Sequence, residues 1–225
     1  MQMADEKMTT TQQTEETDSR QRILNVALNL FMTQGYAAVS TRQICAAAGV
    51  KQPSLYHHFG NKEGLYLAVV QNWFDSAHES IANAIQTRVT LREKLHGIAA
   101  IFWNTSLGDY QTMQRDALQN MPDEHMAILF KSIYTSVIAP VMQVMEWGIA
   151  HGDLPDYAEA YPLTQLFWAF ISGIEGVYTR GDPFPAPADN ISSIDFFLAG
   201  AKGLAPEVYK SWPVNERLNA IRFSK

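Results

Sequence analysis

The sequence predicts an all-α protein, and three observations support that class. Apolar residues recur at steps of three and four along most of the chain, which is the period of a helix with one buried face. Glycine or proline stands at each main break between these periodic stretches, where either residue ends a helix. We find no run of alternating polar and apolar residues long enough to suggest a strand.

Four helices are expected in the first part of the chain, each with a recognisable start or stop. Gly35 ends the first helix. Ser40 and Gln43 have the spacing of a capping box at the start of the second. Pro53 suits only the first turn of the third, and Asn61 can cap the fourth. The expected ranges are 19–34, 41–48, 52–58 and 61 to the high 80s.

The later helices are longer and richer in aromatic residues. Their expected ranges are 90–106, 110–119, 122–150, 157–179 and 190–203, with a short terminal helix somewhere in 206–223. The first 18 residues are polar and acidic, so we expect them to be disordered. The predicted domains are therefore a small N-terminal one over 19–66 and a larger one over 67–225.

Charge is distributed unevenly along the chain. The whole chain has a net charge of −6, which argues against a nucleic-acid partner. Residues 18–66, however, hold five basic residues against two acidic ones and so carry a net charge of +3. A phosphate-binding surface needs local cations and not a basic whole protein. A segment of this charge can also arise by chance.

The composition indicates a soluble, cytoplasmic protein with a packed core. Hydrophobic residues make up 47% of the chain. The single cysteine, Cys45, excludes an internal disulfide framework and a multi-cysteine zinc site. The N-terminus lacks the basic start and apolar stretch of a signal peptide. The most apolar window, residues 163–178, is too short to span a bilayer and contains Glu175.

The second and third helices have the features of a helix-turn-helix. Gly49 supplies a turn residue that tolerates positive φ. Cys45 and Ala48 are small enough for two helices to cross closely. Three apolar residues are spaced to bury both helices against another: Ile44, Val50 and Leu55. The alternative is a helical corner within a core, without any role in DNA binding.

A helix-turn-helix would place the N-terminal residues of its second helix in the major groove. Gln52 and Ser54 lie there, and both can hydrogen-bond to base edges. Thr41 and Arg42 begin the supporting helix, where backbone N–H groups favour phosphate. Arg42 is also long enough to reach a guanine. Two cations flank the second helix and suit phosphates: Lys51 and Lys62.

Residues 23–70 resemble the DNA-binding domain of the TetR family of bacterial regulators. The ordered motifs that carry the resemblance are Phe31 with "GY", then "STRQI", "AAGV", "LYHHF" and "NKEGL". The resemblance implies phosphate contacts by Tyr56, His58 and Lys62. It implies contacts to phosphates or bases by Thr41, Arg42, Lys51, Gln52, Pro53 and Ser54. Cys45 replaces the family's usual alanine, and Gly64 stands early in the fourth helix.

The two adjacent histidines raise the question of a metal site. His57 and His58 point about 100° apart on a helix, so they cannot readily share one ion, and we expect no metal. His57 occupies a variable position of the family, where a DNA contact and a solvated side chain are both open. For His58 the alternative to a phosphate contact is packing beside the fourth helix.

The resemblance also implies that the larger domain dimerises. An apolar stripe runs along 157–179, and a second apolar helix follows at 190–203. Two such helices from each subunit would make a four-helix interface. The expected interface residues are Leu166, Phe170, Gly173, Ile174, Val177, Ile194, Phe197 and Leu198. The alternative is that the stripe is core within one chain.

The resemblance further implies a small-molecule pocket, which aromatic and methionine residues would suit. The candidates are Phe102, Trp103, Met113, Met126, Phe130, Tyr134, Met142, Trp147 and Trp168. Glu175 could anchor a cation or could face solvent or the interface. The alternative for each aromatic or methionine residue is that it belongs to an ordinary core.

These observations predict a ligand-responsive transcriptional regulator, usually a repressor in this family. We expect a homodimer on a palindromic double-stranded DNA operator, released when a small, largely apolar effector shifts the fourth helix. We find no nucleophile elbow, P-loop, dinucleotide fingerprint or metalloprotease motif, so we expect no enzymatic activity and no cofactor. Two alternatives remain. One is an all-α binding protein or enzyme without DNA function, and the other is a DNA-binding protein without an effector.

Overall fold

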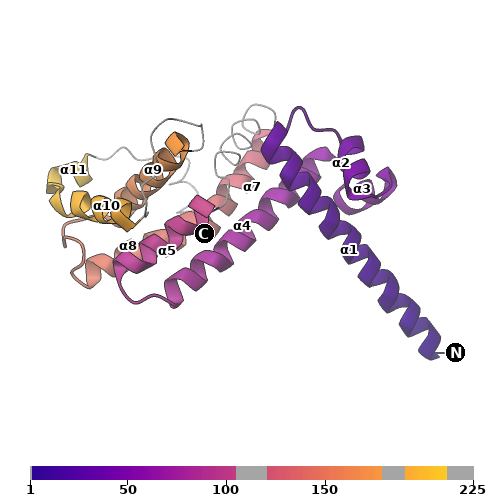
Figure 1. The fold of residues 1–225 in the computed structure, drawn as a ribbon, viewed down its shortest axis with the longest axis horizontal. Helices are drawn as coiled ribbons and strands as arrows, with labels where there is room; N and C mark the ends of the chain where they lie inside the picture. Colours follow the sequence, from indigo (N-terminus) through magenta and orange to yellow (C-terminus); the bar gives the residue numbers. More distant parts are fainter. Residues whose placement is uncertain (1, 105–120, 179–190, 212–225) are drawn as a thin grey trace. The chain divides into compact units, whose positions relative to one another are not determined.

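The computed structural model describes residues 2–104, 121–178 and 191–211, and every regular element in these ranges is helical (Figure 1). This confirms the predicted all-α class. The first helices are α1 (Gln2–Gln34), α2 (Thr41–Ala48), α3 (Gln52–Phe59), α4 (Lys62–Gln86) and α5 (Leu91–Asn104). The later ones are α7 (Asp123–Ile133), the π-helix η1 (Tyr134–Ile138), α8 (Ala139–Ala150), α9 (Ala160–Tyr178), α10 (Ile191–Gly203) and α11 (Pro206–Lys210).

The described residues form two compact units. The first unit holds residues 2–73 and 121–126, and the second holds the remaining described residues. The division falls within α4, between Trp73 and Phe74, and within α7, between Met126 and Ala127, whereas the sequence placed a single boundary at residue 66. Two helices thus contribute to both units, and a pattern of helix starts and stops has no signal for a boundary inside a helix.

The beginning of the chain differs from the sequence prediction. The helix α1 begins at Gln2 and not near Ser19, so the expected disordered tail over 1–18 is corrected to helix from Gln2. Neither glycine nor proline interrupts residues 2–34, so no residue in that stretch strongly opposes a helix. The predicted helix over 110–119 lies outside the described residues.

An aromatic cluster holds the first unit together. The Phe31 side chain is fully buried, and its ring lies 5.9 Å from that of Tyr36 and 5.2 Å from that of Tyr66. The rings of Tyr36 and Tyr66 meet edge to face at 5.0 Å. The cluster is surrounded by buried aliphatic residues, which include Ile23, Leu24, Ala27, Ile44, Leu55 and Leu65. These contacts bring α1, α2, α3 and the start of α4 around one core.

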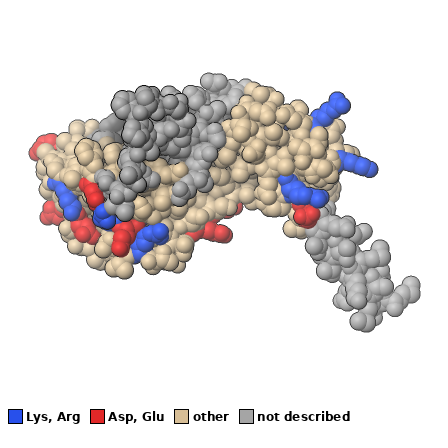
Figure 2. Space-filling view, in the orientation of Figure 1, with Lys and Arg blue, Asp and Glu red and all other residues tan. Residues whose placement is uncertain are grey.

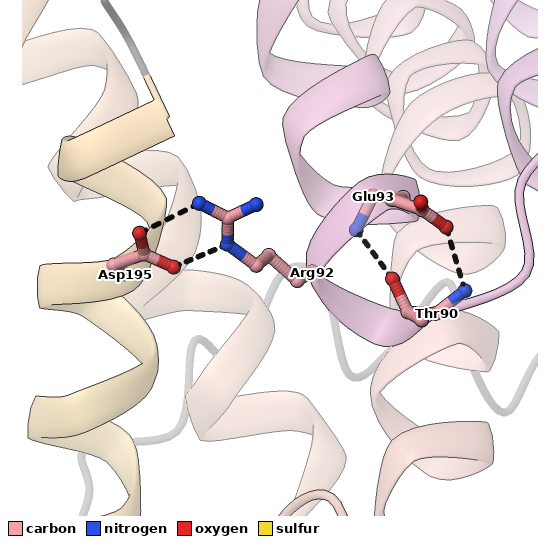
Figure 3. A network of polar contacts seen from close by, with 4 residues as sticks. All are labelled: Thr90, Arg92, Glu93 and Asp195. Atoms are coloured by element: carbon pink, nitrogen blue, oxygen red, sulfur yellow. Dashed lines mark hydrogen bonds and ion pairs between the residues drawn. The ribbon is translucent and has the colours of Figure 1, made fainter.

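Within the second unit, α5, α8, α9 and α10 pack together. The start of α5 has a capping box, because Glu93 accepts from the backbone N–H of Thr90 at 3.0 Å and Thr90 caps Glu93 in return at 3.2 Å (Figure 3). These hydrogen bonds hold the pKa of Glu93 below its ordinary value. Arg92 binds Asp195 of α10 through two nitrogens, at 2.5 and 2.8 Å. This pair joins α5 to α10 and lowers the pKa of the Asp195 carboxyl.

The predicted helix over 122–150 contains a π-helical turn, η1, that a proline explains. Pro140 has no N–H, and its ring would collide with the carbonyl four residues earlier, that of Ser136. The wider π-turn relieves that crowding, and His78 Nδ1 lies 3.3 Å from the Ser136 oxygen. Because a carbonyl can only accept, the imidazole donates this hydrogen bond and replaces the missing N–H.

Replacing His78 with alanine should destabilise the second unit by about 1–2 kcal/mol, because the buried Ser136 carbonyl loses its partner. Pro140→Ala restores a backbone N–H near this carbonyl. In that background His78→Ala should lower the free energy of unfolding by less than about half of its effect in the wild-type chain. Chemical denaturation of the four variants measures both values. Equal costs in the two backgrounds would contradict this account of the π-turn.

Residues 124–150 form one stretch that is long and apolar enough to cross a membrane by length and composition. Half of its most apolar window is buried inside the protein. Its residues Val141, Val144 and Met145 are core residues that are at most 2% exposed. The stretch therefore has the features of a core helix.

Candidate nucleic-acid interface

The turn between α2 and α3 has the geometry that the helix-turn-helix requires. Gly49 adopts φ +65°, in the left-handed region that favours glycine. The N–H of Val50 donates to the carbonyl of Cys45 at 3.0 Å, and the N–H of Gly49 donates to the carbonyl of Ala46 at 3.4 Å. These two bonds form a Schellman motif that ends α2. A Cβ at Gly49 would meet nothing within 4 Å, so the backbone conformation and not space demands glycine.

Each helix of the motif begins as the sequence predicted. Ser40 caps α2 by accepting from the backbone N–H of Gln43 at 3.2 Å. Lys51 precedes α3 without a side-chain cap, and Pro53 lies in its first turn. The first N–H groups of α3 therefore lack a side-chain acceptor, which leaves that end suited to an anion.

The recognition helix α3 exposes one face and buries the other. Leu55 is fully buried and Phe59 is 9% exposed, and both anchor α3 within the first unit. On the outer face Lys51, Gln52 and Pro53 are exposed, and Tyr56 is 45% exposed. His57 is also exposed, whereas Ser54 and His58 are half-buried. The predicted DNA contacts therefore gather on the outer face and at its edge.

Three of the predicted phosphate-binding side chains are held in place by neighbours. Lys62 lies over the Tyr36 ring, with its Nζ 4.3 Å from the ring centre. The Tyr56 hydroxyl lies 3.3 Å from Thr41 Oγ1, and His58 Nε2 lies 3.0 Å from Ser19 Oγ. This role of Tyr36 and Ser19 has no local sequence signal, because both act through contacts between residues distant in sequence.

The surface of the first unit is basic in the view of Figure 2, where lysine and arginine side chains project around the helix-turn-helix. Arg42 on α2 and Lys51 before α3 are both exposed, and neither pairs with a carboxylate of the described residues. His57 and His58 meet edge to face with ring centres 5.5 Å apart. No group of three metal-binding side chains occurs in the part of the chain that the structure describes.

Cys45 lies 4% exposed at the crossing of α2 with its neighbours, where the sequence analysis placed it. Burial raises the pKa of its thiol, so the side chain stays protonated at neutral pH. It packs there as a small apolar residue in place of the family's usual alanine.

A second candidate surface lies on α9 and α10 of the second unit. It is an open apolar groove of about 430 Å³ lined by Leu166, Ala169, Phe170, Phe196, Phe197, Gly200, Ala201 and Leu204. We call these residues the α9–α10 groove. Phe196 is 73% exposed, and its ring stacks on that of Phe170 at 6.1 Å. Phe170 itself is half-buried, so the exposed apolar surface of the pair comes mainly from Phe196, and an exposed apolar groove of this kind is typical of an interaction surface.

The predicted interface residues divide between this groove and other places. Leu166, Phe170 and Phe197 line the groove, and Gly173 is exposed on the same helix as the first two. Ile194 is fully buried within its own unit, and Leu198 lines a different hollow beside Arg92 and Asp195. The side chains of Ile174 and Val177 lie outside the described residues. The sequence analysis missed Phe196, because helical periodicity alone did not separate it from its neighbour Phe197.

The predicted pocket residues do not all come together. Phe102 and Trp168 meet edge to face at 4.5 Å, and Phe102 is 2% exposed. Trp147 instead stacks on His151 at 4.2 Å, below the ammonium of Lys94. Met126 and Met142 are buried, whereas Phe130 and Tyr134 are half-buried. Met113 and the side chain of Glu175 lie outside the described residues.

Two buried donors distinguish the neighbourhood of the Phe102–Trp168 pair. The indole N–H groups of Trp103 and Trp168 are buried and have no hydrogen-bond partner among the described residues. A buried donor without a partner costs about 1–3 kcal/mol. A ligand with an acceptor atom would remove that cost.

Comparison with known proteins agrees with the geometry of the first unit. Residues 23–69 match the profile of bacterial regulatory proteins of the tetR family. The transcriptional activator FasR of Mycolicibacterium smegmatis is 33% identical over 87 residues, which cover 39% of this chain and 40% of FasR. The repressor ComR of Escherichia coli is 27% identical over 161 residues, covering 69% of this chain and 77% of ComR.

Solved structures share the fold over most of the chain. The fatty acid degradation regulator FadR of Bacillus halodurans has a TM-score of 0.70 at 14% identity, covering 81% of this chain and 95% of FadR. FadR of Bacillus subtilis in complex with stearoyl-CoA has a TM-score of 0.66 at 15% identity, covering 81% and 97%. The match to the family profile, the exposed recognition helix and this shared fold define the class as a helix-turn-helix regulator. Residues 23–69 of the chain are a DNA-binding domain of the tetR family of bacterial regulatory proteins.

Proposed function

We propose that this protein is a ligand-responsive transcriptional regulator that binds a palindromic DNA operator as a homodimer. The observation that carries the proposal is the exposed outer face of α3, which presents Gln52 and Tyr56 on a helix that a left-handed glycine turns outward. The names of related proteins, among them an activator and a repressor, support a role in transcription. In the alternative without DNA function, this exposed basic face would have no role.

DNA recognition would divide between base edges and phosphates. Gln52 and Ser54, in the first turn of α3, are placed to hydrogen-bond to bases in the major groove. Lys51, Tyr56 and Lys62 surround that turn and would contact the backbone on either side. Phosphate contacts fix the register of the helix, and the base contacts supply specificity.

The second copy in the dimer would cover the α9–α10 groove. Its rings and small residues face out of one chain, and a two-fold axis would bring the same surface of a partner onto them. Gly200 in α10 has open space around its Cα and would let a partner helix approach closely. Covering the groove would also remove the exposed Phe196 ring from water.

The effector would be largely apolar with at least one acceptor atom. The Phe102–Trp168 pair supplies an apolar wall, and the two unpartnered indole N–H groups supply donors. A solved structure of Bacillus subtilis FadR contains stearoyl-CoA, whose long acyl chain is apolar and whose thioester oxygen is an acceptor. Effector binding would favour an arrangement of α4 in which the two recognition helices no longer match the spacing of successive major grooves. The coupling free energy between effector binding and DNA binding would be about 1–3 kcal/mol.

Repression is the sign of regulation that we propose, with effector binding releasing the operator. The protein would act in the cytoplasm without a cofactor and without enzymatic activity. The related regulators act in transcription, which agrees with this reading.

Binding to the DNA upstream of its own gene tests the proposal. Fluorescence anisotropy across a salt series should show an association constant that falls steeply with salt, because phosphate contacts release counterions. Lys62→Ala should weaken binding to this fragment and to unrelated DNA alike, whereas Gln52→Ala should weaken only the specific complex. Lys131→Ala, which removes an exposed lysine of the second unit, serves as the control. Equal affinity for the upstream fragment and unrelated DNA would contradict specific recognition there.

A further inference from the structure

We propose that Arg20 on α1 is an additional phosphate contact, so that the DNA interface extends from the helix-turn-helix onto the first helix. This inference rests on the proposed DNA-binding function. Neither the family motifs nor the predicted contacts include Arg20, which lies before the region that resembles the family.

Two contacts place this part of α1 against the end of the recognition helix. Ser19 Oγ lies 3.0 Å from Nε2 of His58, a predicted phosphate contact. The next residue, Arg20, places its guanidinium carbon 5.5 Å from the centre of the Phe59 ring. Consecutive residues of α1 therefore meet consecutive residues of α3, and the Arg20 cation lies beside the surface expected to face the DNA backbone.

The guanidinium of Arg20 is held in position by an aromatic ring. The Phe59 ring is 9% exposed and so gives the guanidinium a fixed support, while the Arg20 side chain remains exposed. Among the described residues no carboxylate pairs with it. Arg22, two residues along the same helix, is instead paired with Asp18 at 3.4 Å.

A nucleic-acid phosphate fits this arrangement better than another ligand would. Guanidinium groups bind phosphate oxygens through planar pairs of N–H donors. Because neighbouring phosphates follow one another along a strand, hydrogen-bonding groups that lie side by side on the protein can follow the same strand. Arg20 and His58 would contact one stretch of backbone in this way, outside the bases that α3 reads.

The salt dependence of DNA binding by the full chain tests the inference, with the upstream fragment bound by the wild-type protein as the probe. Arg20→Ala should reduce the slope of log K against log salt by about 0.9, the value for one lost phosphate contact. Arg20→Lys should restore most of the slope, because it keeps the charge. Arg22→Ala removes the same charge from the same helix and should leave the slope within experimental error.

The possible outcomes separate the two proposals. A wild-type slope in Arg20→Ala, with the protein folded by circular dichroism, would overturn the role of Arg20 and leave the DNA-binding function standing. Equal losses in Arg20→Ala and Arg22→Ala would also overturn it, because the effect would then come from net charge. Absence of salt-dependent DNA binding by the wild-type protein would instead contradict the proposed function, and with it this inference.

Discussion

Replacing Phe196 with aspartate is expected to convert the proposed dimer into monomers and to abolish operator binding. In one chain the Phe196 ring is 73% exposed, so the change should affect the stability of the monomer little. In the proposed dimer, two unpaired carboxylates would be buried in the apolar α9–α10 groove near the two-fold axis. An uncompensated buried charge costs about 3–5 kcal/mol, which weakens association by roughly 10²- to 10³-fold or more.

Sedimentation velocity measures the dimer, and anisotropy on the upstream DNA measures its consequence. Val89→Asp is the matched control, because Val89 is an apolar side chain that is 80% exposed and lies outside the groove. It should leave both the dimer and DNA binding intact. A Phe196→Asp protein that sediments as a dimer would show that another surface joins the two copies.

Replacing Phe31 with alanine should also abolish DNA binding, but here the dimer should persist. Phe31 is fully buried and contacts both Tyr36 and Tyr66, so its removal leaves a cavity in the centre of the first unit. Such a change costs about 3–5 kcal/mol, a large share of the stability of so small a unit. Helix α3 would then lose its support, whereas the α9–α10 groove belongs to the other unit.

Phe31→Leu keeps most of the volume and should retain DNA binding with a smaller loss of stability. Thermal unfolding followed by near-ultraviolet circular dichroism, together with sedimentation of both variants, measures these effects. Dissociation of the Phe31→Ala dimer would mean that dimerisation by the second unit depends on the folding of the first. Full operator binding by the same variant would mean that the aromatic cluster does not support α3.

The two variants together separate the parts of the proposed mechanism. Phe196→Asp removes the pairing of two recognition helices and leaves each helix folded. Phe31→Ala removes the folded helix and leaves the pairing. Loss of operator binding in both cases, with opposite results in sedimentation, is the pattern that a dimeric helix-turn-helix regulator requires.

The sequence predicted the helix-turn-helix well because its signals are local. Ser40, Gly49 and Pro53 act through the backbone of their own or adjacent turns, so the predicted start and end of α2 and the start of α3 agree with the structure. The buried face of α3 was predicted from Leu55, which the structure buries fully. Rules for caps and turns are sufficient to place a helix end where one residue fixes the backbone of its own turn.

Features that depend on distant contacts were beyond the reach of the sequence. The π-turn required Pro140 and His78 to meet from separate helices, and the exposure of Phe196 depended on how α10 packs on α9. The proposed role of Arg20 likewise depends on the position of Ser19 beside His58. The continuation of α1 to Gln2 runs through an acidic, polar segment that has no apolar periodicity to predict a helix.

Selection of bound sequences from a randomised pool of double-stranded DNA tests the central claim most directly. A dimer that presents two copies of α3 should enrich an inverted repeat whose half-sites lie about 34–36 Å apart or at a multiple of that distance. Recovery of such a repeat by the wild-type protein, and its loss with Phe196→Asp, is the result that we predict. A pool with no enriched motif after repeated rounds, from protein shown to be folded and dimeric, would contradict sequence-specific DNA recognition by this chain.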